Sequence, residues 1–286
     1  MNQAVVRCCW LLLVLGSCFG CRRATVSEDS TVAHERIVSL SPAITETLFV
    51  LGAGPRLVAV SDYCHEPSVV NSLTRVGTIF TPRFEAIAQA RPTTIVAERI
   101  DGTNVAELER LSHTLTYRWL TFDNVIESTR ALGKAFGKRA EAERLVATYE
   151  QALKAELAAR APRVLLALAH VPGQLNEIWF IRNNSFHGRA LEAAGAKNAV
   201  AEDVVGPPRL GLERAIQLDP DGIILLQPAE NGNQALLDDY RRLTGLRAVR
   251  DGKLALVAAP ELQVPGPRIV RFVERLRTAL AKWGTN

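Results

Sequence analysis

The sequence predicts an α/β fold of two lobes, each built on a parallel sheet, joined by one long rigid α-helix. Apolar runs typical of buried strands alternate with helical patterns from residue 36 onward. A unit of helix, proline and buried strand occurs near residue 85 and again near residue 213. Residues 124–160, between the two copies, are almost all helix formers. We therefore expect an N-terminal lobe at 36–123, a connecting helical region at 124–161 and a C-terminal lobe at 162–286.

Length and charge are compatible with this organisation and exclude some functions. The chain has 286 residues, enough for two domains, and its 48% hydrophobic content can supply two cores. Its 34 basic and 30 acidic residues give a net charge of only +4, and the basic residues are scattered singly. Aromatic residues make up 6% of the chain, too few for a stacking platform. We therefore expect no nucleic-acid partner.

The N-terminus is predicted to be an export signal. One positive charge precedes an apolar run at residues 8–15, which is too short to span a bilayer. The sequence Leu-Gly-Ser-Cys at 15–18 resembles a lipoprotein signal-peptidase site, which makes residues 1–17 the signal peptide and Cys18 the acylated residue. Cys21, or a plain secretory signal, is the alternative. Residues 18–35 would then tether a membrane-anchored lipoprotein in the periplasm or at the cell surface.

Cysteine use agrees with an exported protein that has no internal disulfide framework. Four of the five cysteines lie in or beside the signal, and Cys64 alone belongs to the folded body. Cys64 is either buried and inert or a thiol beside a ligand.

The N-terminal lobe begins with a strand at residues 36–40. Ser41 and Pro42 are predicted as the N-cap and first residue of a helix that ends at Gly52. A strand at 57–60 leads to a polar and aromatic cluster at 61–65, at the carboxyl end where open α/β sheets bind ligands. A helix starting at 81–82 and ended by Pro92 precedes a strand at 94–97, followed by a helix at 101–111 and a strand at 115–120.

The connecting region is predicted to finish as one long amphipathic helix. Leu145, Tyr149, Ala152, Leu153 and Glu156 recur at helical spacing, and Pro162 marks the end. In the C-terminal lobe, strands are expected at 163–169, 178–181, 198–201 and 254–258, with helices around 191–194, 213, 236–246 and 269–283.

The helix, proline and strand unit has the same layout in both lobes. Glu85 lies in the first turn of one helix, with Pro92 seven residues later and a strand directly after it. Glu213 and Pro220 repeat this spacing before the next strand. A repeat at this separation indicates two similar lobes.

These segments together resemble a known family, the substrate-binding proteins of ABC importers for metal chelates, in particular the cobalamin- and ferric-siderophore-binding type of the TroA-like helical-backbone superfamily. The resemblance rests on four segments and covers about residues 36–284: RIVSLSPAITETLFVLGAG, VAVSDYCHEP, FEAIAQARPTTIVAE with its echo LERAIQLDPDGIILL, and PGPRIVRFVERL. It implies two Rossmann-like lobes of a class III periplasmic binding protein, with the ligand held between them. The partners implied are a permease dimer with its ATPase subunits, and the binding protein itself is expected to be a monomer.

Five residues are candidate ligand contacts because they fall in segments expected to face the space between the lobes: Tyr63, Phe80, Trp179, Phe186 and Arg209. Flat aromatic faces suit a corrin, a porphyrin or an aromatic siderophore. Trp179 also fits a core position, since it lies in an apolar strand.

In this family a glutamate on each lobe engages arginines of the membrane subunits, and Glu85 and Glu213 occupy the matching positions. The alternative role is local, because an acidic residue in the first helical turn interacts favourably with the helix dipole.

A bare-metal site is a weaker hypothesis. His65 beside the ligand loop is a candidate metal contact, and His170 and His187 could complete a set of three, but the remaining pattern fits the chelate type better.

Enzymatic functions find little support. The sequence has neither a Gly-x-Ser-x-Gly elbow nor a P-loop, and Gly52-x-Gly54 follows a helix, which is the wrong context for dinucleotide binding. We expect a non-enzymatic protein without a cofactor that binds a chelate, with cobalamin the first candidate and a siderophore or haem the alternatives. An exported oxidoreductase on a similar fold is the remaining alternative.

Overall fold

The computed structural model describes residues 35–103, 105–204, 207–228 and 233–284. By internal contacts the chain divides into residues 1–34 and 35–286, and the second unit is the subject below. The predicted signal peptide, Cys18 and Cys21 therefore lie outside the described residues. No helix in the described part is long and apolar enough to cross a membrane.

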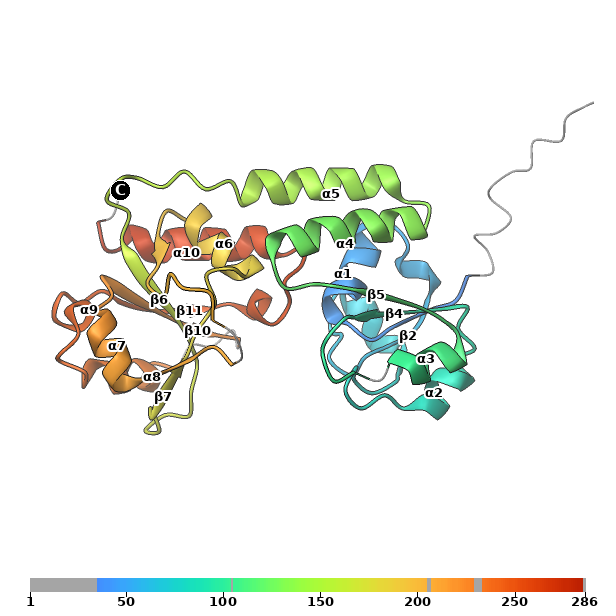
Figure 1. The fold of residues 1–286 in the computed structure, drawn as a ribbon, viewed down its shortest axis with the longest axis horizontal. Helices are drawn as coiled ribbons and strands as arrows, with labels where there is room; N and C mark the ends of the chain where they lie inside the picture. The colour runs from blue at the N-terminus through green and yellow to red at the C-terminus, as the bar shows by residue number, and fades with distance from the viewer. Residues whose placement is uncertain (1–34, 104, 205–206, 229–232, 285–286) are drawn as a thin grey trace, which may run out of the picture. The chain divides into compact units, whose positions relative to one another are not determined.

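The N-terminal lobe is built on a sheet whose strand order is β3-β2-β1-β4-β5, with every described pairing parallel (Figure 1). Its strands are β1 (Ile37–Ser39), β2 (Leu57–Val60), β3 (Thr74–Arg75), β4 (Thr94–Glu98) and β5 (His113–Tyr117). Its helices are α1 (Pro42–Val50), α2 (Phe84–Gln89) and α3 (Val105–Leu111), with short 3₁₀ turns at Gly54–Arg56 and Ser68–Ser72. Ser41 is the N-cap of α1 as predicted, because its hydroxyl accepts a hydrogen bond from the Ile44 amide.

The C-terminal lobe contains a parallel sheet of order β11-β10-β6-β8 and a separate antiparallel ribbon of β7 and β9. Its strands are β6 (Arg163–Leu168), β7 (Glu177–Trp179), β8 (Lys197–Asn198), β9 (Arg209–Gly211), β10 (Gly222–Gln227) and β11 (Leu254–Ala258). Its helices are α6 (Phe186–Ala193), α7 (Leu212–Leu218), α8 (Ala235–Arg241), α9 (Arg247–Arg250) and α10 (Ile269–Ala281), with a 3₁₀ turn at Pro260–Gln263.

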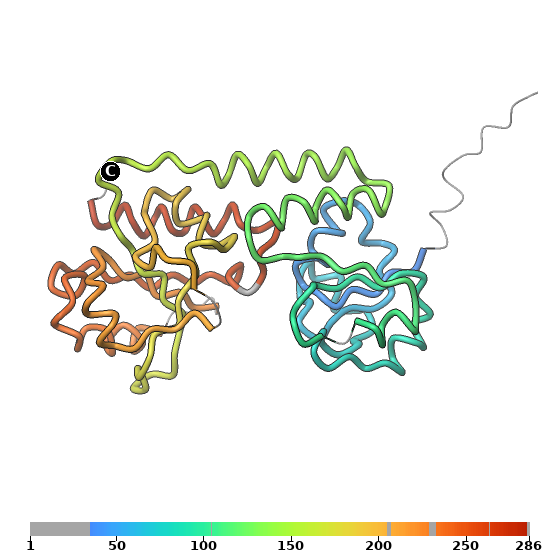
Figure 2. Tube along the Cα trace, viewed as in Figure 1, coloured from blue at the N-terminus to red at the C-terminus, as the bar shows by residue number. Residues whose placement is uncertain are grey.

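The connecting region is a pair of packed helices, α4 (Phe122–Ala135) and α5 (Arg139–Ala152), which Figure 2 traces as two neighbouring coils. The chain reverses at Gly137, whose φ of 67° favours glycine. The predicted long helix is too long at its C-terminal end, because α5 stops at Ala152 and Glu156 lies beyond it. Residues 154–160 are mostly exposed, so they gain little from packing, and helical propensity alone is marginal in water.

The two lobes share one apolar core. A single cluster of buried side chains includes Leu48 from α1, Tyr149 from α5 and Phe272 from α10. Polar contacts cross between the lobes as well. The Arg268 guanidinium donates to both carboxylate oxygens of Glu46, at 2.9 and 2.7 Å, and the Trp119 indole donates to the Pro265 carbonyl at 2.6 Å.

The helix, proline and strand repeat predicted from the sequence is present in the backbone. α2 leads through Pro92 to β4, and α7 leads through Pro220 to β10. β4 pairs with β1, and β10 pairs with β6. In each lobe the strand after the proline therefore lies next to the first strand of the same sheet. The residues before the two prolines, Arg91 and Asp219, both have positive φ, at 46° and 39°. This conformation is rare outside glycine, which makes the shared geometry specific.

Candidate functional site

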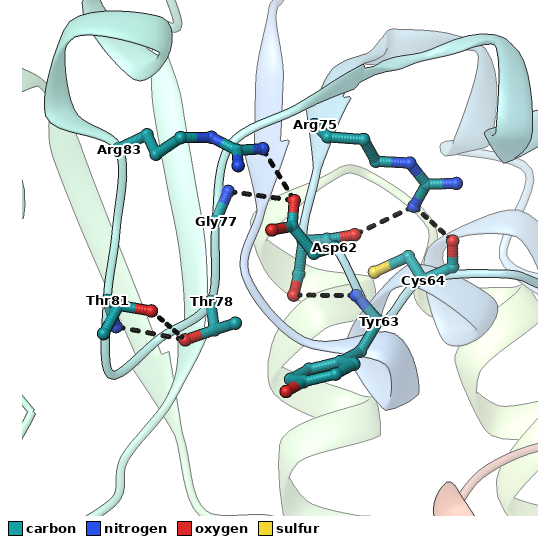
Figure 3. A network of polar contacts seen from close by, with 9 residues as sticks. Asp62, Tyr63, Cys64, Arg75, Gly77, Thr78, Thr81 and Arg83 are labelled. Carbon is teal, nitrogen blue, oxygen red and sulfur yellow. Dashed lines mark hydrogen bonds and ion pairs between the residues drawn. The ribbon is translucent and has the colours of Figure 1, made fainter.

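The loop after β2 is fastened to the loop after β3 through Asp62. The Asp62 amide donates to the Gly77 carbonyl at 2.8 Å, and the Gly77 amide donates back to Asp62 Oδ1 at 3.2 Å. The Arg83 guanidinium donates to the same oxygen at 2.7 Å, as Figure 3 shows. The loops after β2 and β3, joined through residues 15 positions apart, therefore hold each other in place.

Arg75 braces the same loop from its other side. Its guanidinium donates to the Ser61 carbonyl at 2.9 Å and to the Cys64 carbonyl (Figure 3). It also donates to Asn71 Oδ1 at 2.9 Å. These bonds fix the backbone on both sides of Tyr63. Arg75 is not among the residues predicted from the sequence, although an arginine at the end of a strand beside a polar cluster is a signal that could have identified it.

The turn that carries Phe80 has its own support. Thr78 Oγ1 accepts hydrogen bonds from the amides of Phe80 and Thr81, at 3.2 and 3.0 Å. Gly77 opens this turn with a φ of +83°, and a Cβ there would lie 2.3 Å from the Thr81 carbonyl oxygen. Only glycine fits this position without displacing the turn.

The two braced loops present aromatic side chains to solvent. Tyr63 is 66% exposed and Phe80 is 63% exposed. An exposed aromatic ring on a loop fixed by hydrogen bonds is an apolar contact surface that needs little ordering when a ligand binds. The structure thus leaves both predicted contacts accessible.

A partly buried carboxyl also lies at the carboxyl ends of these strands. Glu98 is the last residue of β4. Ser41 lies two residues after the end of β1, and its hydroxyl donates a short hydrogen bond to Glu98 Oε1. Burial raises the pKa of Glu98, and the Ser41 bond opposes this only in part. From the sequence, Ser41 is predicted only as a helix cap, and Glu98 is not among the predicted site residues.

Cys64 is inert by this geometry. Its side chain is fully buried and its sulfur lies 3.2 Å from Thr45 Oγ1. Burial raises the pKa of the thiol to about 11, so the thiolate is scarce at neutral pH. Of the two roles left open by the sequence, the structure favours the buried one.

In the C-terminal lobe the ribbon brings Trp179 and Arg209 together. They are paired residues in the β7–β9 ladder, and the Arg209 guanidinium lies 3.3 Å from Glu177 Oε2. The Trp179 indole donates to the other oxygen of Glu177 at 2.9 Å. Trp179 is 40% exposed, so it is not a core residue.

Phe186 differs from the exposed loop position that the sequence predicted. It is the first residue of α6 and has no exposed surface. Its ring stacks on Phe122 at 6.3 Å between centroids and meets the Tyr149 ring edge-on at 5.4 Å. Because α4 and α5 cover it, Phe186 is a core residue that anchors α6, and we leave it out of the candidate site.

The three histidines considered for metal binding have three different surroundings. His65 is exposed, and His170 Nε2 lies 2.9 Å from Asp239 Oδ2. His187 is buried beside the Glu261 carbonyl at 3.3 Å. Within the described residues, no group of three or more histidine, cysteine or acidic side chains could hold a metal ion.

Glu85 and Glu213 are both exposed in the first turns of α2 and α7. Each follows a candidate ligand contact closely, since Phe80 precedes Glu85 by five residues and Arg209 precedes Glu213 by four. The two copies therefore place an acidic side chain at the same point of the same unit.

Comparison with known proteins places this architecture among binding proteins. The periplasmic binding protein family model matches residues 37–260. A cobalamin-binding protein of Halobacterium salinarum is 27% identical over 255 residues, covering 86% of this chain and 69% of its own. The ABC transporter substrate-binding lipoprotein YvrC of Bacillus subtilis is 24% identical, covering 89% and 83%. A solved periplasmic heme-binding protein of Pseudomonas aeruginosa has a TM-score of 0.68 at 23% identity, covering 86% of this chain and 92% of its own.

Proposed function

This chain belongs to the periplasmic binding protein family, and from that premise we propose that it is the substrate-binding component of an ABC importer for a metal chelate, with cobalamin as the first candidate. The cobalamin-binding relative and the ABC transporter lipoprotein, which both cover most of the chain, support this proposal. In this function the protein binds its ligand without changing it, and the two lobes hold the ligand between them.

The observation that carries the proposal is the pair of exposed aromatic side chains, Tyr63 and Phe80, on loops held by hydrogen bonds. A planar macrocycle or aromatic chelator gains most from flat, preordered apolar surfaces. On the C-terminal lobe, Trp179 supplies a third partly exposed ring, and the neighbouring Arg209 offers a guanidinium for a phosphate or carboxylate of the ligand.

We propose that Glu85 and Glu213 dock the protein onto the two permease subunits. Both are exposed, and the described residues give neither of them an ion-pair partner. A pair of acidic side chains in equivalent positions suits a two-fold symmetric basic partner. Because each glutamate follows a proposed ligand contact within one short segment, docking and ligand contact are mechanically close in both lobes.

The lobes are proposed to move little when the ligand binds. The shared core through α4, α5 and α10 and the buried Glu46–Arg268 pair support this, because both would have to break for a large hinge motion. Solution scattering with and without ligand tests it, and a large ligand-induced decrease in radius of gyration would contradict it.

The ligand test is equilibrium dialysis of the full-length protein against cyanocobalamin, with haem and a ferric catecholate as competitors. We expect one-to-one retention of cobalamin. Tyr63→Ala and Phe80→Ala should each weaken retention about tenfold, which corresponds to roughly 1.4 kcal/mol. Leu111→Ala, an exposed apolar residue on α3, is the matched control and should bind as the wild type does.

Other dialysis outcomes would replace the proposed ligand. Retention of haem or the catecholate instead of cobalamin would keep the importer function and make it one of iron uptake, in line with the structural likeness to a heme-binding protein. Release of a nicotinamide or flavin on denaturation would instead favour an oxidoreductase and contradict a purely binding function.

The docking test is uptake of labelled ligand by cells that carry the importer. The double charge reversal Glu85→Arg with Glu213→Arg should abolish uptake while ligand affinity in dialysis stays the same. Glu109→Arg, at an exposed position of α3, is the control and should support normal uptake. Normal uptake by the double variant would disprove the docking proposal.

The lipid anchor remains a proposal from the sequence, with Cys18 as the acylated residue and Cys21 as the alternative. It would place the protein on the outer face of the membrane, in the periplasm or at the cell surface. Labelling with radioactive palmitate that Cys18→Ala abolishes, but Cys21→Ala does not, is the expected result. We also propose that the protein acts as a monomer.

A further inference from the structure

β11 is an edge strand whose outer backbone groups have no strand partner among the described residues. Among the described strands it pairs only with β10, through five parallel residue pairs from Leu254 to Ala258. Open edges of this kind are templates for an additional strand unless the protein covers them. This edge belongs neither to the aromatic surface nor to the paired glutamates.

The hydrogen-bond pattern shows which groups face outward. The Ile223 amide donates to the Lys253 carbonyl at 3.0 Å, and the Ala259 amide donates to the Gln227 carbonyl at 2.8 Å. In a parallel ladder the residues of a strand alternate between the two sides. Since Lys253 and Ala259 face β10, Leu254, Leu256 and Ala258 direct their N–H and C=O groups away from the sheet.

These outward groups form the floor of a groove. A cavity of about 860 Å³ is lined by all five β11 residues together with side chains of α8 and α10. The two helices cover opposite faces of the sheet, because Val257 packs in the cluster that contains α10, and Leu254 and Leu256 pack against the cluster that contains α8 (Figure 1). The groove therefore has a strand edge as its floor and a helix on each side.

The α10 wall is strongly basic. Arg271, Arg275 and Lys282 line the cavity, and among the described residues that line it Glu274 is the one acidic residue. Arg275 lies 3.4 Å from Glu261, whereas the ion pairs of the described residues include neither Arg271 nor Lys282. Arg271 and Arg275 are four residues apart, and Lys282, directly after the last residue of α10, follows seven residues later, so all three share one face.

The α8 wall is different in character. Its lining residues are Gln234, Leu237 and Arg241. Arg241 is paired with Asp238 in its own helix, and Leu237, which is largely buried, is the apolar residue of α8 that lines the cavity. A strand placed in the groove would thus meet cations on one side and a mixed surface with an apolar centre on the other.

We propose that the β11 groove binds an extended segment of a partner protein by strand addition, and that this segment alternates acidic and apolar residues. The partner's backbone would bond to the outward groups of Leu254, Leu256 and Ala258. Successive side chains of a strand point to opposite faces. Acidic side chains at every second position would therefore face Arg271, Arg275 and Lys282, and the apolar ones between them would face Leu237. The charge of the α10 wall selects an acidic segment over a neutral or basic one.

The test uses the full-length protein and two fluorescent seven-residue peptides, one alternating Glu with Val and one alternating Lys with Val. Anisotropy at low ionic strength should show saturable binding of the Glu peptide alone, and added salt should weaken it. Hydrogen exchange resolved to single amides should show new protection at Leu254, Leu256 and Ala258. The amides of Ala255 and Val257, which face β10, should not change.

Variants separate charge from backbone pairing. Arg271→Glu combined with Lys282→Glu should weaken binding of the Glu peptide at least about tenfold. Ala258→Pro removes one outward N–H without removing a bond to β10, and should also weaken binding while the melting temperature stays close to that of the wild type. Lys134→Glu, an exposed lysine on α4, is the control and should bind normally.

Four results would overturn the proposal. Equal binding of both peptides would show that the charge of the α10 wall does not select the segment, and binding of neither would show that the cations only protect the edge from pairing. Binding of the Glu peptide without protection of the three outward amides would reduce the groove to a general anion site. A dimer of the chain that Ala258→Pro dissociates would make a second copy the occupant.

Discussion

The loops at the carboxyl ends of the N-terminal sheet are held by side chains, whereas the ribbon that extends the C-terminal lobe is held by backbone. Hydrogen bonds of Asp62 and Arg75 hold the loop that carries Tyr63, and hydrogen bonds to Thr78 hold the turn that carries Phe80. Trp179 instead lies in a ladder whose register pairs it with Arg209, and its side-chain contact with Glu177 is exposed.

This difference indicates which substitutions should change the shape of each surface. A loop held by side chains loses its shape when one of those side chains is removed. A ribbon held by main-chain hydrogen bonds keeps its shape through most substitutions. The N-terminal surface is thus the more specifically built of the two, and the C-terminal surface tolerates more variation.

Acid should act on the two lobes in opposite directions, and the larger effect should come from the C-terminal lobe. Burial lowers the pKa of His187 in α6 to about 4. The unfolded chain therefore binds more protons than the folded one between about pH 6.5 and pH 4, and His187 costs about 3 kcal/mol of stability as the pH falls through this window. Urea unfolding of the wild type and of His187→Gln from pH 7 to pH 4 measures this.

His187→Gln should remove that part of the acid sensitivity, since glutamine can still donate to the Glu261 carbonyl. His65→Gln, on the exposed loop of the other lobe, is the matched control. Parallel curves for the wild type and His187→Gln would show that burial of the imidazole does not govern the acid response.

The next largest expected change in the free energy of unfolding comes from comparing one arginine of each lobe. Arg75→Ala leaves the Cys64 carbonyl without its donor, removes one of the two donors to the Ser61 carbonyl, and should lower the free energy of unfolding by about 2 kcal/mol. Arg209→Ala removes an exposed ion pair and should change it by no more than about 0.5 kcal/mol. Both are measured by urea unfolding at pH 7. Equal losses would contradict the distinction between side-chain and backbone support.

The smallest change in the pH dependence of stability is expected at Glu98. Because burial raises its pKa, the folded protein binds more protons than the unfolded chain above the ordinary carboxyl range. Glu98 therefore lowers stability as the pH rises through that window. Glu98→Gln should raise the free energy of unfolding at pH 7 and leave it nearly unchanged at pH 4. A loss of stability at pH 7 would show that the charged form is favoured by its surroundings.

Much of the fold was predictable because its signals are local. Pro42 after a capping serine, Ser185 before α6 and Gly195 after it all mark helix ends through bonds within a few residues. The apolar runs at β2 and β11 match the predicted strands residue for residue. The end of α5 was not predictable in this way, because residues 154–160 have helical propensity but no buried face.

The candidate site was predictable only in part. Tyr63 and Phe80 were predicted as ligand contacts because they follow strand ends in a polar context, and the structure leaves both exposed. Arg75 and the Ser41–Glu98 pair were missed because their contacts join residues 11 to 57 positions apart. Phe186 was misplaced for the same reason, since the rings that bury it come from α4 and α5.

The sequence by itself determined the alternation of strands and helices, the repeat around Glu85 and Glu213, and the exported character predicted for the N-terminus. These depend on hydrogen bonds and side-chain preferences within a few residues. The tertiary structure decided which aromatic rings are exposed, which carboxyl is buried, the pairing of Trp179 with Arg209, and the open edge of β11 between two helices. Burial and strand pairing depend on which distant segments meet, and a linear pattern carries no direct record of that.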